Sequence, residues 1–181
     1  LRADEGCQLR DTCIEEASEG STAVLMCMLM ALRVSEVVSR VVRDIDLGGT
    51  VMRVDDNDDV AFRLKTESSR RPVRIPVLLR PLLARLADGK QPTAPLFPGS
   101  VAGRRRRQWL HEETGRLCKK AGVPVICPHS LRGMMATIAV AAGELPEVVA
   151  QALGHRTGGA QAGERTRPGT EGARPWHGAS H

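Results

Sequence analysis

Tyrosine is absent from the 181 residues, and the other aromatic side chains amount to two tryptophans and two phenylalanines. Long hydrophobic runs are also missing. The longest, residues 23–32, is about half of what a bilayer span needs and lies too far inside the chain for a secretory signal. The five cysteines show neither CxxC spacing nor paired histidine ligands, so neither a disulfide framework nor a zinc site is indicated. These absences predict a protein of the reducing cytoplasm with no membrane segment, no metal and no small-molecule cofactor.

Apolar residues make up 41% of the chain, which is enough to fill the core of one folded domain. The net charge of +5 is distributed unevenly. Residues 1–20 hold six acids and two bases, whereas residues 62–74 hold five bases and one acid, and residues 103–120 hold seven bases and two acids. Clustered positive charge suits a polyanion such as nucleic acid, although a solvated helix face is an equally common reason for one such run.

The hydrophobic pattern predicts an α+β fold that is mainly helical. Residues 21–33 are apolar nearly all round, as in a core helix, and a second helix is expected from Ser35 to Ile45. Arg33 then lies in the joint between these two helices. Three β-type runs follow at residues 50–54, 60–65 and 71–77, separated by turn-like segments. They predict a small three-stranded antiparallel sheet whose second turn carries Lys65 at a strand end.

Further helices are expected at residues 78–89, 104–122, 130–142 and 146–155. Residues 156–181 differ in composition, because they contain six glycines and two prolines but no Val, Ile, Leu, Met or Phe. Since such a segment has little apolar surface to bury, we expect it to be disordered.

Polar motifs occur in a defined order along this framework. "ALRVSE" contains Arg33 and Glu36, Lys65 follows on the expected hairpin, "HSLR" contains His129 and Arg132, and "LGH" ends at His155. Each motif alone is a weak signal. As a set, over residues 20–157, they resemble the catalytic domain of the tyrosine recombinases, also called phage integrases.

The resemblance implies a role for each residue in breaking and rejoining DNA phosphodiesters. Arg33 and Arg132 would bind the nonbridging oxygens, because forked guanidinium groups match two oxygens at once. Lys65 would protonate the leaving oxygen as a general acid. His129 would accept a proton or donate to the phosphate, and His155 would donate a further hydrogen bond. Glu36 would orient Arg33 or His129 without contacting the phosphate itself.

The same resemblance implies double-stranded DNA as the partner, with further recombinase protomers as a second possible one. The basic residues outside the motifs are candidates for contacting the DNA backbone: Arg70, Arg71, Arg104, Arg105, Arg106 and Arg107. Among them, Arg70 and Arg71, together with Arg63, are alternatives to Lys65 as phosphate-binding groups on the hairpin.

The expected organisation has three parts. Residues 1–20 form an acidic N-terminal remnant, residues 21–157 the integrase-like catalytic domain, and residues 158–181 a Gly/Arg-rich disordered tail. The first residue is leucine and the amino-terminal DNA-clamping domain usual in integrases is not seen, so we expect a chain that has lost its amino-terminal part.

The chain departs from the family at the nucleophile. The family's tyrosine would stand about nine residues after the last histidine, where this sequence has Glu164. A change of reading frame after codon 155 would account for this departure. The sequence therefore leaves three hypotheses: a recombinase catalytic domain that does not cleave DNA by itself, a noncatalytic DNA-binding or regulatory module, or the poorly folded product of a decayed gene.

Overall fold

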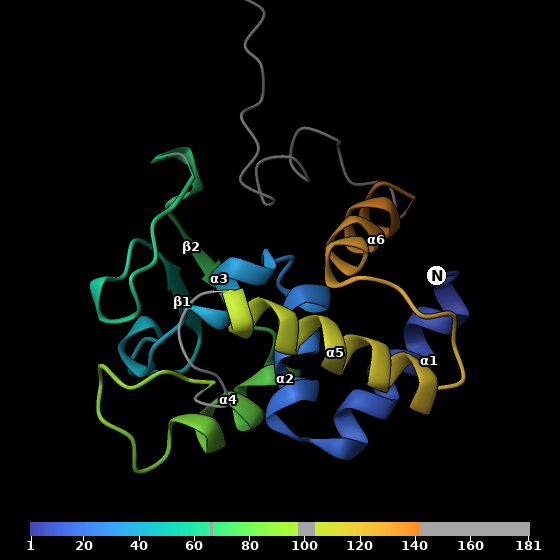
Figure 1. Ribbon diagram of the computed structural model, residues 1–181, viewed down its shortest axis with the longest axis horizontal. Coiled ribbons are helices and arrows are strands. Elements are labelled where there is room, and N and C mark those ends of the chain that lie inside the picture. Colours follow the sequence, from blue (N-terminus) through green and yellow to red (C-terminus); the bar gives the residue numbers. More distant parts are fainter. Residues whose placement is uncertain (66, 98–103, 142–181) are drawn as a thin grey trace, which may run out of the picture.

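The computed structural model describes residues 1–65, 67–97 and 104–141 (Figure 1). The α-helices in these ranges are α1 (Ala3–Glu16), α2 (Glu19–Leu29), α3 (Val34–Val38), α4 (Arg80–Ala87), α5 (Arg104–Lys120) and α6 (Pro128–Ala141). The strands are β1 (Val51–Val54) and β2 (Arg71–Arg74), and short 3-10 turns occur at Val42–Asp44, Asp58–Val60, Glu67–Ser69 and Val77–Leu79. Among the described helices, none is long and apolar enough to cross a membrane.

Helix α2 forms the centre of the core, as its nearly continuous apolar sequence predicts. Every residue from Gly20 to Met28 is buried, and the helix packs against α1, α5 and α6. It begins earlier than predicted because the Ser18 hydroxyl caps it, accepting a hydrogen bond from the Ser21 N–H at 3.1 Å. Figure 1 shows α5 running alongside this core, with the sheet on one side of the molecule and α6 on the other.

Helix α1 was not predicted, because residues 1–20 were interpreted as an acidic N-terminal remnant. Its Leu9 and Cys13 are fully buried in the same core as α2. At its end, the Glu16 carboxylate accepts hydrogen bonds from Arg116 and from Lys120 of α5, the latter at 2.7 Å. The acidic segment at the start of the chain thus contributes to the core and is joined to α5 by ion pairs.

The sheet has two strands rather than the three that were predicted. Strands β1 and β2 are antiparallel, with Val51 opposite Arg74 and Val54 opposite Arg71. The prediction of a strand at residues 60–65 is wrong. The Asn57 side chain accepts from the Asp59 N–H and caps a 3-10 turn, and Ala61 then takes a left-handed conformation with φ 51°. This local geometry turns the chain back on itself where an extended strand was expected.

Helix α3 is much shorter than the predicted helix and ends at Val38 instead of continuing to Ile45. The difference is due to Arg40, two residues beyond the helix end. Arg40 is fully buried, and its guanidinium group donates to the carbonyl oxygens of Arg53 and Asp55 at 2.9 and 3.0 Å. These hydrogen bonds stabilise the non-helical backbone that follows Val38. The joint containing Arg33 is confirmed, since Arg33 is the residue that precedes α3.

The remaining predicted helices agree with the structure to within a few residues. Residues 80–87, 104–120 and 128–141 are helical where 78–89, 104–122 and 130–142 were predicted. The predicted helix at 146–155 and the tail at 158–181 lie outside the described residues. The mainly helical fold class is confirmed, with the sheet reduced by one strand.

Candidate functional site

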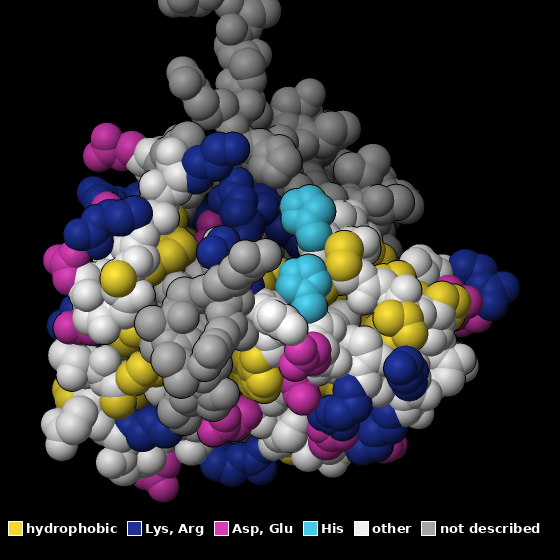
Figure 2. Space-filling view, in the orientation of Figure 1, with side chains coloured by type: hydrophobic (Ala, Val, Ile, Leu, Met, Phe, Trp, Pro, Cys, Tyr) yellow, Lys and Arg dark blue, Asp and Glu magenta, His cyan; other side chains and the backbone are white. Residues whose placement is uncertain are grey.

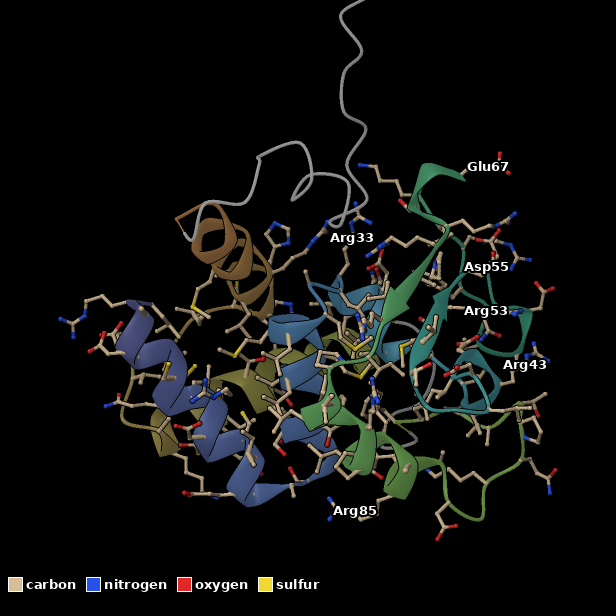
Figure 3. The ribbon with its side chains drawn as sticks, turned by 180° about the vertical axis from the view of Figure 1, so that it is seen from behind. Arg33, Arg43, Arg53, Asp55, Glu67 and Arg85 are labelled. Atoms are coloured by element: carbon tan, nitrogen blue, oxygen red, sulfur yellow. The ribbon has the colours of Figure 1, made fainter. Side chains whose placement is uncertain are left out.

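The site begins at the turn between α2 and α3. Ala31 has a left-handed backbone with φ 51°, a conformation that residues other than glycine rarely adopt. This turn buries Leu32 and sets Arg33 at the start of α3. In Figure 3, Arg33 lies between helix α6 and the sheet.

Glu36 fixes the position of Arg33. Its carboxylate is 1% exposed and accepts the backbone N–H of Arg33 at 2.8 Å and the guanidinium of Arg33 at 2.7 Å. It also accepts both terminal nitrogens of Arg71, from strand β2, at 3.2 Å each. Burial alone would raise the pKa of Glu36, but the hydrogen bonds from Arg71 and Arg33 outweigh it and hold that pKa below its usual value.

Arg132 joins this cluster from α6. It is 4% exposed, and burial lowers the pKa of its guanidinium group. The positive charge of Arg33 lowers this pKa further, and the Glu36 carboxylate acts in the opposite direction. Arg33, Arg71 and Arg132 thus place three positive charges around the single negative charge of Glu36. An excess of buried positive charge favours the binding of an anion.

A cavity of about 300 Å³ opens beside Arg33. Its cationic lining comes from segments far apart in the sequence: Arg33 before α3, Arg63 and Lys65 after the 3-10 turn at Asp58–Val60, and Arg107 in α5. Its other lining residues are Ser35, Glu36, Val38, Ser39, Val60, Ala61, Phe62, Leu64 and Ser69. Figure 2 shows Lys and Arg side chains gathered on the upper part of this face, with histidine side chains beside them.

The structure brings most of the predicted pocket residues together. Arg33, Glu36 and Lys65 line the same cavity, and Arg132 lies within electrostatic range of the first two. His129 is exposed in the first turn of α6, three residues before Arg132 and therefore on the same side of that helix. His155 and Glu164 lie outside the described residues.

The predicted DNA contacts differ in their surroundings. Arg70 is half exposed and pairs with Asp55 at 2.7 Å, whereas Arg71 is directed inward to Glu36. Arg107 lines the cavity, and the side chains of residues 104–106 lie outside the described part of the chain. Within the described ranges, no group of three or more His, Cys, Asp or Glu side chains is placed to hold a metal ion.

Sequence reasoning missed Arg40 and Ser69. Arg40 connects α3 to β1 and stacks on the Phe62 ring at 5.2 Å, and the Ser69 hydroxyl lies 3.4 Å from the Arg33 guanidinium. Arg40 stands four residues after Glu36, a spacing that also fits an exposed helical ion pair, so the sequence carried no signal for its burial. Ser69 was assigned to a turn on composition alone.

The fold and the site together define a mainly helical domain in which distant cationic side chains surround one pocket beside a two-stranded sheet. The chain belongs to the phage integrase family, whose model matches residues 1–160. This match confirms the resemblance to tyrosine recombinases. No curated protein sequence matches the chain.

Solved structures of recombinases have the same fold. A XerA recombinase is 22% identical with a TM-score of 0.66, and the match covers 87% of this chain and 54% of that one. A Tn1549 transposon integrase in complex with transposon right end DNA is 22% identical with a TM-score of 0.58, covering 75% and 50% of the two chains. The same integrase in complex with circular intermediate DNA is 20% identical with a TM-score of 0.58, covering 75% and 51%. The chain thus spans about half the length of these relatives.

Proposed function

We propose that this chain is the DNA-binding catalytic domain of a site-specific tyrosine recombinase, of the kind that integrates and recombines DNA, and that its residues do not supply the attacking tyrosine. The observation that carries the proposal is the convergence of Arg33, Lys65 and Arg107 on one cavity, with Arg132 within electrostatic range of Arg33. The DNA in the two integrase complexes with the same fold agrees with a DNA partner.

The pocket residues have distinct tasks in this proposal. Arg33 and Arg132 bind the nonbridging oxygens of one DNA phosphate, and Glu36 holds Arg33 in place through the hydrogen bonds described above. Lys65 protonates the 5′ oxygen that leaves when a phosphodiester breaks. His129, and His155 beyond the described residues, donate further hydrogen bonds or move protons at the phosphate. Removing one preorganised donor of this kind typically costs an enzyme about a hundredfold to a thousandfold in rate, and Arg33 would be such a donor.

The nucleophile is the missing part. The 181 residues contain no tyrosine, and Glu164 stands near the place where the family pattern has one. The chain is therefore expected to hold DNA without forming a covalent bond to it, either as an inactive recombinase domain or as a noncatalytic DNA-binding or regulatory module.

DNA binding also uses the basic surface around the pocket. The segment at residues 62–74 and the amino-terminal turn of α5 carry the other candidate contacts, among them Arg70 and Arg104–107. Contacts of this kind are made to the DNA backbone, so the affinity should depend strongly on salt and only weakly on sequence. Another recombinase protomer is the second partner we propose.

A nicked suicide duplex tests both parts of the proposal. The chain is incubated with the labelled duplex at low salt, then run on a native gel and on a denaturing gel. We expect a mobility shift that added salt abolishes and no covalent adduct on the denaturing gel. The absence of any shift would overturn the DNA-binding part, and an adduct would overturn the statement about the nucleophile.

A repaired chain separates the two noncovalent hypotheses. In this version a helix that bears a tyrosine replaces residues 156–181. Covalent capture by the repaired chain alone would favour a recombinase site that lacks only its nucleophile. Binding without capture in both versions would favour the noncatalytic module.

A further inference from the structure

Arg71 binds the Glu36 carboxylate of the site but does not itself line the cavity. Its two terminal nitrogens form an end-on fork with the two carboxylate oxygens of Glu36 at 3.2 Å each, and one of them also donates to the carbonyl oxygen of Ser69 at 2.9 Å. Its side chain is 11% exposed, compared with 51% for the neighbouring Arg70. Both terminal nitrogens of Arg71 are therefore engaged inside the protein.

Ser69 completes a ring of contacts. Its hydroxyl lies 3.4 Å from the Arg33 guanidinium and its carbonyl oxygen accepts from Arg71, while Glu36 accepts from both arginines. The ring joins the start of α3 to the segment that runs from Lys65 to β2, and Lys65 stands only four residues before Ser69. Arg33 and the segment that begins with Lys65 are thus joined through Glu36, Ser69 and Arg71.

We propose that Arg71 is a positioning residue: through its fork with Glu36 it holds Arg33, and with it the segment carrying Lys65, in the geometry that receives a DNA phosphate. This inference deepens the proposed function and rests on it. Arg71 was expected from the sequence to contact DNA. In the structure its fork faces Glu36, it does not line the cavity, and its Nε–H has no hydrogen-bond partner among the described residues.

The charges around Glu36 determine how its carboxylate responds to the removal of Arg71. The charged and titratable groups that act on this carboxylate, or on which it acts, are Arg33 and Arg40 on its own segment, Arg71 on β2, Arg132 on α6 and Cys27 on α2. Without Arg71 the carboxylate keeps the hydrogen bonds of Arg33 but loses half of its guanidinium partners. Because burial acts to raise the pKa of Glu36, that pKa should rise. A protonated Glu36 carries no negative charge, so it no longer forms an ion pair with Arg33.

The test uses the full chain with Arg71→Met, and with Arg85→Met as a control that removes the same charge from an exposed position outside the candidate DNA contacts. The Glu36 carboxyl is titrated by ¹³C NMR without DNA, and the affinity for a short duplex is measured by fluorescence anisotropy from pH 5 to pH 7. We expect the Glu36 pKa to rise in R71M and to stay unchanged in R85M. We also expect R71M to bind about tenfold more weakly than R85M at pH 5, with a smaller difference at pH 7.

A third variant keeps the proposal testable if R71M does not fold. Arg71→Lys retains the charge but not the fork, so its Glu36 pKa and its affinity should fall between those of the wild type and R71M. An unchanged Glu36 pKa in R71M, or wild-type behaviour of R71K in both measurements, would overturn the inference. Failure of the wild type to bind duplex would overturn the proposed function instead, and the NMR titration would still decide whether Arg71 controls Glu36.

Discussion

Replacing Arg40 by methionine should destabilise the protein severely, although Arg40 lies outside the cavity. Its fully buried guanidinium group donates to three backbone carbonyls, those of Glu36, Arg53 and Asp55, at 2.9 to 3.0 Å, and pairs with Asp44 at 3.2 Å. The methionine would fill much of the space but would leave these acceptors without a donor and Asp44 without its counter-charge.

The expected loss can be estimated from that arrangement. Breaking a buried ion pair by removing one partner costs about 3–5 kcal/mol, and single hydrogen bonds to charged groups are worth about 1.5–3 kcal/mol each but do not add up. We therefore expect R40M to lower the free energy of unfolding by about 3–5 kcal/mol, which is a large part of the roughly 5–15 kcal/mol typical of a folded domain. Urea denaturation followed by circular dichroism measures this quantity.

Arg43 provides the matched control. It lies three residues away, is half exposed and forms an ion pair with Asp59. Exposed pairs contribute at most about 1 kcal/mol, so R43M should lose no more than that. The double variant R40M/D44N should recover part of the loss, because it also removes the unpaired carboxylate. A loss below about 1 kcal/mol in R40M, or one equal to that in R43M, would refute the reasoning.

Three further outcomes are expected. Ala31→Gly should raise the free energy of unfolding by up to about 1 kcal/mol in urea denaturation, because the backbone there has φ 51°; a loss would show that this conformation carries no strain. Hydrogen bonds from the basic side chains of α5 lower the pKa of Glu16. The contribution of Glu16 to stability is therefore complete above the ordinary carboxyl pKa and is lost as the pH falls below it. The E16Q variant should cost about 1 kcal/mol at pH 7 and flatten this acid dependence in thermal melts, and an unchanged pH profile would contradict the prediction. Cys127 is exposed, and its hydrogen bond with Ser130 is the main cause that lowers its pKa, so it should react with iodoacetamide in the native protein. Burial raises the pKa of Cys13 and of Cys27 to about 12, so these two should react only after unfolding. Mass spectrometry of the modified peptides measures the order, and the reverse order would contradict the prediction.

The sequence predicted the elements whose hydrophobic pattern is strong. The apolar helix around residues 23–32, the amphipathic helix that became α5 and the joint at Arg33 all agree with the structure. In these segments local periodicity and burial favour the same conformation.

The errors arose where side chains form hydrogen bonds with backbone groups, either close by in the sequence or across the fold. The predicted strand at 60–65 failed because Asn57 caps a tight turn, and the predicted long helix after Ser35 ended early because Arg40 is drawn into the core. For the site, the motifs indicated which residues belong together, but the shared use of Glu36 by Arg33 and Arg71 depends on a contact across 35 residues of sequence that no local pattern reveals.

The salt dependence of DNA binding tests the central claim most directly, namely that the pocket around Arg33 receives a DNA phosphate. The affinity for a short duplex is measured by fluorescence anisotropy over a range of salt concentrations for the wild type, Arg33→Met and Arg85→Met. Arg85 is the charge-matched control, because it lies at the opposite end of the molecule from Arg33 (Figure 3). The account predicts that R33M binds more weakly and that its slope of log affinity against log salt is smaller by about 1, whereas R85M keeps the wild-type slope. Equal slopes for all three proteins would contradict it.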